Sequence, residues 1–272
     1  MPITRPILRY HGGKFILGDW IISHFPAHRV YTEPFGGAAS VLLQKDRSYG
    51  EVYNDMDGEI VNLFRVVRSQ GQDLIGLLEL TPFSRDDYRE SFKPCEDTLE
   101  QARRTCVRSF MGFGSNSLCR NIQSGFRANS NRSGTTPAHD WKNYPSSLKA
   151  VIERLQGVVI ENRDAIDLML HHDSLETLHY CDPPYVQATR SAKVHGHHGY
   201  SHEMTDEQHS AFLDVVRNLK GMVCISGYAH PLYDSALANW NRVERNSHAD
   251  SARDRVEVLW MNYQAPQERL FK

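Results

Sequence analysis

Strand-like segments alternate with helical segments along most of this 272-residue chain. Short apolar or β-branched runs predict five strands, and four of them lead into stretches with helical spacing. The predicted strands cover residues 30–35, 51–55, 158–162, 177–181 and 222–226, and the predicted helices cover residues 38–45, 58–68, 165–171 and 205–219. A late strand over residues 256–263 is expected to be antiparallel. This alternation predicts an α/β fold, a mainly parallel sheet with helices on both faces, and ligands bind such sheets beyond the carboxyl ends of the strands.

The stretch from 72 to 140 interrupts the alternation. It contains two helical segments, 85–92 and 98–110, followed by residues rich in Gly, Ser, Asn and Arg. We therefore predict a sheet domain made of residues 1–71 and 141–272. Residues 72–140 are predicted to form a small, mostly helical domain inserted into it.

Positive charge is concentrated in one part of the chain. The whole protein has a formal net charge of −2, but residues 101–154 contain nine Lys or Arg and only two Asp or Glu, a net charge of +7. The rest of the chain therefore carries −9. Two interpretations remain open for the segment: a mobile surface loop with solvated charges, or a surface that faces a polyanion, where arginines contact phosphates or base edges.

Composition excludes several other classes of protein. Apolar residues make up 40% of the chain and charged residues 24%, which is typical of a globular enzyme, and no run approaches 18 apolar residues. The start, MPITRPILRYHGGK, lacks the apolar core of a signal peptide. The five cysteines are scattered and form no Cys-x-x-Cys pair. These features favour a cytoplasmic protein over a secreted, disulfide-bonded or zinc-ribbon protein.

Two glycine pairs suggest close approach of the backbone to a ligand. The first predicted strand ends in EPFGG at 33–37, but Ala38 and Ala39 stand where a dinucleotide fingerprint would need further glycines. The GGK at 12–14 suggests a phosphate-binding loop. Leu8 occupies the position of the upstream glycine, however, and Phe15 replaces the Ser or Thr that would bind magnesium. NTP hydrolysis is therefore disfavoured.

Carboxylates follow the second and third predicted strands. Asp55 and Asp164 are placed where a carboxylate often holds the ribose of a nucleotide or of an S-adenosyl ligand. A helix begins shortly after each of them, so Asp55 or its neighbour Asp57, and likewise Asp164, could instead be helix N-caps. The sequence leaves both interpretations open.

The fourth predicted strand ends in the most specific motif, YCDPPY at 180–185. Two consecutive prolines remove two backbone donors and fix two φ angles, so Asp182 and Tyr185 are presented on a rigid turn. An acidic residue before the prolines and an aromatic one after them, at the end of a buried strand, favours a functional role over a simple strand terminator.

These motifs, taken in order, resemble the Dam-type adenine-N6 DNA methyltransferases, which use S-adenosyl-methionine. The resemblance covers nearly the whole chain and rests on RYHGGK at 9–14, EPFGG at 33–37, Asp55, the basic segment, Asp164, DPPY at 182–185, and Tyr200 and His209 downstream. The recognition insert lies between the cofactor loop and the catalytic loop, which is the order of the α group. The chain departs from the family at Ala39, where many members have Gly, and at residues 9–11, where Lys-Trp and a small residue are expected.

The resemblance implies a Rossmann-like methyltransferase sheet with an inserted DNA-recognition domain. It implies a site-specific enzyme that transfers a methyl group from S-adenosyl-methionine to the N6 amine of a flipped adenine in double-stranded DNA, releases S-adenosyl-homocysteine and uses no metal. The implied catalytic residues are Asp182, Pro183, Pro184 and Tyr185. The implied cofactor-binding residues are Tyr10, Gly12, Gly13, Lys14, Glu33, Pro34, Phe35, Gly37, Asp55, Asp164 and Asp182. The implied DNA-binding residues are Arg9, Arg120, Asn121, Arg127, Arg132, Lys142, Arg190 and Tyr200.

The chemistry of adenine supports these roles. The exocyclic amine is a poor nucleophile because its lone pair is delocalised into the ring. The Asp182 carboxylate and the Pro183 carbonyl can each accept one amine hydrogen, and Tyr185 can stack on the flipped base. By the resemblance, Asp55 would hold the ribose hydroxyls of the cofactor and Asp164 its adenine amino group. We expect at least one arginine of the insert to recognise a guanine rather than only neutralise phosphates.

Other functions remain as alternatives. Enzymes that methylate RNA or a protein glutamine tend to have Asn at the position of Asp182, and an N-methyltransferase for small molecules would not need the basic insert. A catalytically silent DNA-binding module is the alternative from another class. The sequence does not determine which DNA sequence is recognised. It leaves open whether the enzyme has a restriction endonuclease partner or is an orphan, and whether it is a monomer or a weak dimer. The expected setting is the cytoplasm of a bacterium or of a phage-infected cell.

A cluster of histidines follows the DPPY motif. His195, His197, His198 and His202 have no Cys or carboxylate at an established ligand spacing, so we expect no metal site there. Residues 187–203 are instead expected to form a mobile lid over the DNA cleft.

Overall fold

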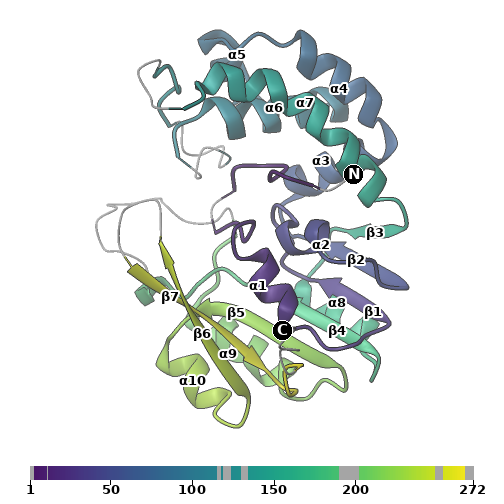
Figure 1. Ribbon diagram of the computed structural model, residues 1–272, viewed down its shortest axis with the longest axis vertical. Coiled ribbons are helices and arrows are strands. Elements are labelled where there is room, and N and C mark those ends of the chain that lie inside the picture. The colour runs from purple at the N-terminus through teal and green to yellow at the C-terminus, as the bar shows by residue number, and fades with distance from the viewer. Residues whose placement is uncertain are drawn as a thin grey trace, which may run out of the picture.

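The computed structural model describes residues 3–10, 12–114, 118, 124–129, 134–189, 202–248 and 254–266. These residues form a seven-stranded sheet in the order β3-β2-β1-β4-β5-β7-β6 (Figure 1). The strands are β1 (Val30–Glu33), β2 (Gly50–Asn54), β3 (Val158–Glu161), β4 (Thr177–Cys181), β5 (Met222–Tyr228), β6 (Asn241–His248) and β7 (Asp254–Met261). β1 to β5 run parallel, whereas β7 pairs antiparallel with both β5 and β6. The predicted α/β class and the antiparallel last strand are confirmed.

The strand order places β4, the strand that leads into the DPPY motif, at the centre of the sheet. From β1 the chain moves outward to β2 and β3, and it then returns to add β4 on the other side of β1. Ligands bind at such a reversal because the two crossovers diverge and leave a crevice beyond the strand ends. All five residues of β4 are buried, as expected for a parallel strand covered on both faces.

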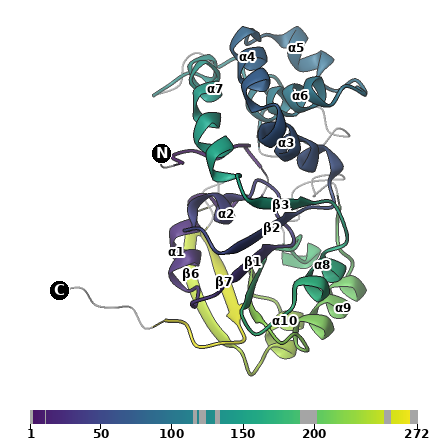
Figure 2. The same ribbon diagram turned by 90° about the vertical axis from the view of Figure 1, so that its right-hand side faces the viewer.

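Helices cover both faces of the sheet (Figure 2). They are α1 (Gly18–Ser23), α2 (Ser40–Gln44), α3 (Gly58–Ser69), α4 (Gly71–Leu80), α5 (Arg85–Glu90), α6 (Thr98–Met111), α7 (Pro137–Arg154), α8 (Ala165–His172), α9 (Asp206–Val216) and α10 (Pro231–Ala236). One buried apolar cluster joins Met169 of α8 and Phe212 of α9 to Ile225 of β5. A second cluster contains Ile21 of α1 and Leu42 of α2, and it continues into the helices above the sheet.

The helices α4 to α7 form a helical lobe at the top of Figure 1. The two predicted helices of the insert correspond to α5 and α6. The helix α7 was not predicted, although Trp141, Tyr144, Leu148 and Val151 have helical spacing and are all buried. Because α7 runs unbroken from the lobe towards β3, the predicted domain boundary between 140 and 141 falls inside this helix.

The N-terminal segment connects the lobe to the sheet. The guanidinium of Arg5 lies 5.3 Å from the centre of the Phe110 ring, and the hydroxyl of Tyr144 donates a hydrogen bond of 2.9 Å to the carbonyl of Ile7. The backbone N–H of Arg9 donates to Ser109 Oγ at 2.7 Å. Residues 5–9 therefore pack on α6 and α7, directly before the glycine-rich turn at 12–14.

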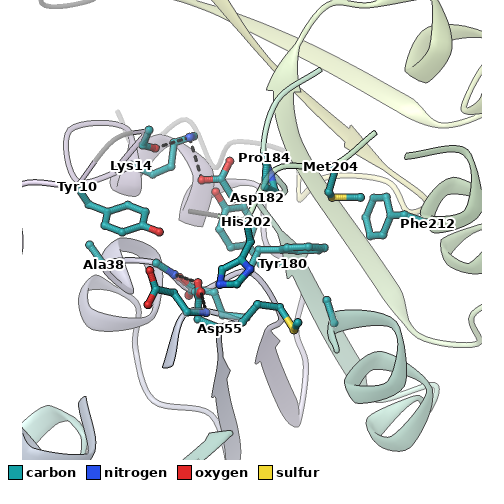
Figure 3. A pocket seen from close by; sticks show the side chains of 18 of the residues that line it. Tyr10, Lys14, Ala38, Asp55, Tyr180, Asp182, Pro184, His202, Met204 and Phe212 are labelled. Atoms are coloured by element: carbon teal, nitrogen blue, oxygen red, sulfur yellow. Dashed lines mark hydrogen bonds and ion pairs between the residues drawn. The ribbon is translucent and has the colours of Figure 1, made fainter. Parts of the chain in front are cut away.

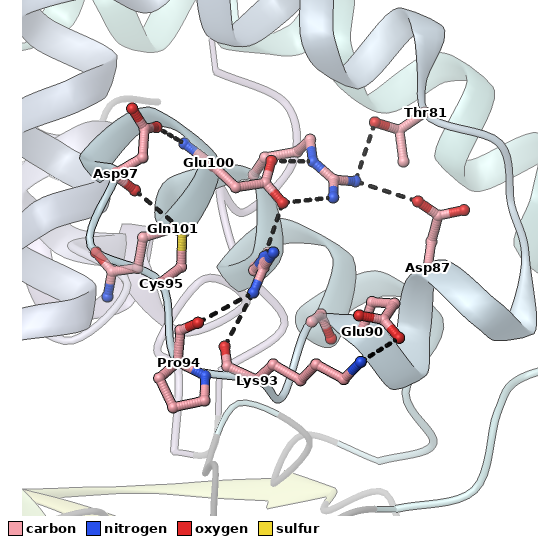
Figure 4. A network of polar contacts seen from close by, with 12 residues as sticks. Thr81, Asp87, Glu90, Lys93, Pro94, Cys95, Asp97, Glu100 and Gln101 are labelled. Carbon is pink, nitrogen blue, oxygen red and sulfur yellow. Dashed lines mark hydrogen bonds and ion pairs between the residues drawn. The ribbon is translucent and has the colours of Figure 1, made fainter.

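Much of the basic charge of the insert is paired within the protein. In the network of Figure 4, Arg103 binds both oxygens of Glu100, at 2.6 and 2.8 Å, and Arg104 binds the same carboxylate at 2.7 Å. Arg108 binds Glu59 at 2.7 Å, and Arg154 binds Glu51 with bonds of 2.6 and 2.8 Å. Because these carboxylates lie outside residues 101–154, the count of +7 overstates the charge that the lobe presents to a partner. Among the described residues, no helix is long and apolar enough to cross a membrane.

The ion pair between Arg108 and Glu59 predicts a stability effect. Arg108 is completely buried, so replacing Glu59 with Ala would leave its guanidinium without its carboxylate partner. We expect Glu59→Ala to lower the free energy of unfolding by about 3 kcal/mol, measured by urea denaturation. The control is Glu79→Ala, an exposed position on α4, which should change it by no more than about 0.5 kcal/mol. Equal effects of the two changes would contradict this role for the pair.

Candidate active site

A cavity of about 520 Å³ lies at the carboxyl ends of the parallel strands (Figure 3). It is at the predicted place, beyond the carboxyl ends of the strands, and the structure adds that the strand order reverses there. The implied cofactor-binding residues that line it are Tyr10, Gly12, Gly13, Lys14, Glu33, Phe35, Gly37, Asp55, Asp164 and Asp182. Pro34 does not line the cavity, and its carbonyl accepts a hydrogen bond of 2.8 Å from Asn54 Nδ2.

The turn after β1 brings backbone to the cavity. Gly37 has a φ of +47°, and a Cβ atom there would lie 2.7 Å from Cε1 of Tyr10, so only glycine fits without displacing this ring. Two residues on, Ala39 has a φ of +52° and precedes α2. This is the departure from the family pattern noted in the sequence. The left-handed conformation costs an alanine roughly 1 kcal/mol, a cost that glycine avoids.

The two acidic residues after β2 have different roles. Asp57 is the N-cap of α3, since its side chain accepts the N–H of Glu59. Asp55 accepts the N–H of Gly37 at 2.7 Å and that of Asp57 at 2.8 Å, and it borders the cavity. Burial disfavours the ionised carboxyl and raises the pKa of Asp55 to about 6, although both N–H groups act in the opposite direction. Asp57 also borders the cavity, so what separates the two residues is that Asp57 caps α3 and Asp55 holds the glycine turn.

Asp164 is both a helix cap and part of the cavity wall. It is the N-cap of α8, and its Oδ1 accepts the N–H groups of Ile166 and Asp167 at 2.9 and 3.2 Å. It also lines the cavity. A carboxylate oxygen has two lone pairs, and both of these bonds are made to Oδ1, so the cap does not exhaust the acceptors of this side chain.

Asp182 is held by two side chains from distant parts of the sequence. Its Oδ2 lies 2.9 Å from the ammonium of Lys14, which is only 5% exposed and also donates to the carbonyl of Gly12. Its Oδ1 accepts a hydrogen bond of 2.8 Å from Ser226, a residue of the neighbouring strand β5. These contacts fix the plane of the carboxylate at the edge of the cavity. Ser226 was missed in the sequence, although it closes a predicted strand and so belongs to the same edge of the sheet.

Tyr185 lies in a second, smaller hollow beside the cavity. This hollow of about 10 Å³ is lined by Pro183, Tyr185, Ser226, Tyr228 and Trp260, among others. The hydroxyl of Tyr185 donates a hydrogen bond of 2.9 Å to Glu257 Oε2, and the Lys14 ammonium lies 4.8 Å from the centre of the ring. The DPPY motif therefore divides between two spaces: Asp182 and Pro184 border the large cavity, and Pro183 and Tyr185 border the small hollow.

Histidines near the site take separate places. His202 lines the cavity, and Figure 3 shows its imidazole pointing towards Asp55. His209 is buried in α9, and its Nδ1 lies 2.9 Å from the hydroxyl of Tyr233. His195, His197 and His198 lie outside the described residues, as does most of the predicted lid at 187–203. Within the part of the chain that the structure describes, no group of three metal-ligating side chains comes together.

The implied DNA-binding residues are only partly described. Arg120, Asn121, Arg132, Arg190 and Tyr200 lie outside the described residues. Arg127 is buried at 9% exposure, and its guanidinium donates to the carbonyl of Phe110 at 2.9 Å. Lys142 is exposed on α7, and Arg9 joins the lobe through Ser109. DNA contact by these three residues stays a prediction.

Comparison with known proteins identifies the family. A family model described as D12 class N6 adenine-specific DNA methyltransferase matches residues 10–247, most of the chain. The chain belongs to this family. It is 27% identical to a DNA adenine methylase from Salmonella typhi, over 80% of this chain and 78% of that protein, and 26% identical to one from Escherichia coli K12, over 78% and 76%. A DNA adenine methylase from Vibrio cholerae is 24% identical over 95% of this chain and 96% of its own.

The family assignment decides among the functions that the sequence left open. This D12-class enzyme methylates the N6 amine of adenine in DNA, so RNA, protein glutamine and small molecules are set aside as substrates. The Rossmann-like methyltransferase fold implied by the resemblance agrees with the mostly parallel sheet.

One buried carboxyl of this enzyme should make its stability depend on pH. Glu33 is 2% exposed, and burial raises its pKa to about 8, although the Tyr31 hydroxyl and the Leu42 N–H both donate to its Oε2. A carboxyl whose pKa is raised on folding makes its full contribution to stability at a pH below its pKa in the unfolded state, which is 4.5. That contribution is lost as the pH rises towards 8, at up to about 1.4 kcal/mol per pH unit.

We predict that Glu33→Gln removes this pH-dependent part of the stability, because a glutamine amide does not ionise and has a shape similar to that of the protonated acid. Unfolding free energies measured by urea denaturation at pH 5, 6, 7 and 8 should decline less steeply for the variant than for the wild type. Parallel curves for the two proteins would show that Glu33 is ionised throughout this range.

Proposed function

We propose that the 520 Å³ cavity binds S-adenosyl-methionine and that Asp182 receives the N6 amine of a flipped adenine at the edge of this cavity. The observation that carries the proposal is the position of Asp182. Its carboxylate is held by Lys14 on one side and Ser226 on the other, between the cavity and the Tyr185 ring. The proposal places the cofactor in the cavity and the adenine beside Asp182, on the face of the Tyr185 ring that Lys14 covers.

The lining of the cavity fits an S-adenosyl ligand. Its volume is within the range of pockets that hold ligands of this size. Ser40 Oγ is buried at its wall and has no hydrogen-bond partner among the described residues, so it is available to a ligand. Asp55 would accept from the ribose hydroxyls, and Asp164 from the adenine amino group. The backbone at Gly37 allows close approach because no side chain intervenes.

Asp182 and Pro183 would activate the amine. Bound S-adenosyl-methionine supplies a methyl group that its sulfonium has already activated, so the protein mainly needs to orient the nucleophile. If the carboxylate and the Pro183 carbonyl each accept one N6 hydrogen, the nitrogen becomes pyramidal and its lone pair can point into the cavity. The nitrogen gains positive charge as its new N–C bond forms. The Asp182 carboxylate stabilises this charge and can take the proton that the nitrogen then loses.

Before a base is bound, Lys14 occupies the position that the proposal gives to the flipped adenine. Its ammonium contacts both the Asp182 carboxylate and the face of Tyr185, the two groups that an adenine would use. An adenine that stacks on this face of Tyr185 must therefore displace Lys14. Until then the ion pair compensates the charge of a carboxylate that is largely withdrawn from solvent.

We propose that the helical lobe, residues 72–140 together with the rest of α7, is the target-recognition domain for duplex DNA. Two observations support this. The lobe stands above the sheet in Figure 1 and contributes none of its described residues to the lining of the cofactor cavity, and it carries the exposed Lys142. Residues 5–9 join it to the glycine turn that presents Lys14, so one continuous segment contacts both the lobe and the site.

Replacing Asp182 tests its proposed role directly. Asp182→Ala should lower the rate of methyl transfer at least about a hundredfold, because it removes the group that orients and neutralises the amine. Transfer of a tritiated methyl group to DNA measures the rate, and calorimetry with S-adenosyl-methionine should give an affinity close to that of the wild type. The control is Asp167→Ala, an exposed carboxylate on α8 outside the cavity. A rate within tenfold of the wild type would rule out the assigned role.

Alanine variants of Asp55 and Asp57 distinguish cofactor binding from helix capping. Asp55→Ala should weaken binding of S-adenosyl-methionine by about 1.5–3 kcal/mol, the size of lost hydrogen bonds to a charged acceptor. Asp57→Ala should leave that affinity nearly unchanged and lower the free energy of unfolding by about 1 kcal/mol, because it removes the cap of α3. Calorimetry and urea denaturation on both variants give the comparison. The reverse pattern would place the ribose at Asp57.

A further inference from the structure

The Tyr185 ring rests against a pair of residues from the antiparallel part of the sheet. Tyr228 of β5 and Glu257 of β7 are directly opposite each other in the strand register. The Tyr228 ring meets the Tyr185 ring edge to face, with centres 4.6 Å apart and an interplanar angle of 77°. Glu257 accepts the hydrogen bond from the Tyr185 hydroxyl at 2.9 Å. One register pair therefore contacts both the ring and the hydroxyl of the aromatic residue in the DPPY motif.

These two contacts restrict both torsions of the Tyr185 side chain. A tyrosine side chain has two main torsions, and an edge-to-face neighbour together with a bond at the far end fixes both. Tyr185 is 7% exposed and Glu257 is 6% exposed, so water competes little for this hydrogen bond. The Lys14 ammonium lies over the ring on the side of Asp182, so a base can reach this face once Lys14 moves.

We propose that Glu257 is a positioning residue for methyl transfer: through the Tyr185 hydroxyl it holds the ring at the angle at which the target adenine stacks. This inference rests on the proposed function of the site. In this proposal Glu257 does not touch the base, and its effect is transmitted through its hydrogen bond to the Tyr185 hydroxyl. A residue of β7, in the antiparallel part of the sheet, would thereby help to position the target base.

A double-mutant cycle tests this transmission. Tyr185→Phe keeps the ring and removes the hydroxyl, and Glu257→Leu removes the acceptor while keeping a similar volume. Each change should lower kcat about tenfold, the effect of losing one well-placed hydrogen bond, with little change in the KM for S-adenosyl-methionine. The double variant should be no slower than either single variant, because both changes break the same bond. Glu257→Gln, which keeps an acceptor oxygen, should stay within about threefold of the wild type.

A second measurement reports on stacking itself. The target site is first mapped by sequencing DNA that the wild-type protein has methylated, and 2-aminopurine then replaces the target adenine. A base stacked on a fixed ring is quenched, so Tyr185→Phe and Glu257→Leu should both raise its emission in the bound complex above the wild-type level. The control is Glu244→Gln, an exposed position on β6, which should change neither emission nor kcat.

The possible results divide clearly. A wild-type protein that makes no methyladenine overturns the proposed function and not this inference alone. If the wild type is active, three results overturn the role of Glu257: kcat and emission of Tyr185→Phe equal to those of the wild type, additive losses in the double variant, or a Glu257→Gln variant as slow as Glu257→Leu. The Tyr185→Phe variant decides the question even if Glu257→Leu does not fold, because it removes the donor of the same hydrogen bond.

Discussion

The geometry of the site depends on the two contacts that hold the Asp182 carboxylate. Lys14 approaches it from the N-terminal segment and Ser226 from the adjacent strand β5, so its two oxygens are fixed by elements 212 residues apart in sequence. A carboxylate at a rigid turn would otherwise rotate freely about its own side-chain torsions. Asp182 directly follows β4, which lies between β1 and β5, so its carboxylate borders the cavity next to Pro183 and Tyr185, which border the small hollow. In the proposed function, both reactants are arranged around this one carboxylate.

The N-terminal segment gives the two parts of the protein a shared element. Its residues Arg5, Ile7 and Arg9 contact helices of the lobe, and Lys14 reaches Asp182. One continuous stretch of backbone therefore carries contacts to the lobe and to the Asp182 carboxylate.

The net charge of a sequence segment was a poor predictor of the charge on its surface. The segment 101–154 has a net charge of +7, but Arg108 binds Glu59 and Arg154 binds Glu51, and both carboxylates lie outside the counted segment. Pairing is a property of spatial neighbours, and neighbours here are tens to more than a hundred residues apart. Helix α7 was missed for a different reason: its apolar spacing was present in the sequence, but the polar, loop-like residues before it obscured where it begins.

The sequence by itself determined the fold class and six of the seven strands, because these follow from periodicity. Its motifs also carried the resemblance to the family, and most of the residues that this resemblance implied for the cofactor line the cavity. The sequence also narrowed Asp55 and Asp57 to two roles without dividing the roles between them. Only the tertiary structure made that division, and only it revealed Ser226 and Glu257. A polar residue inside a predicted strand looks like any other until its neighbour across the sheet is known. Strand order and register create those neighbours, and no local pattern encodes them.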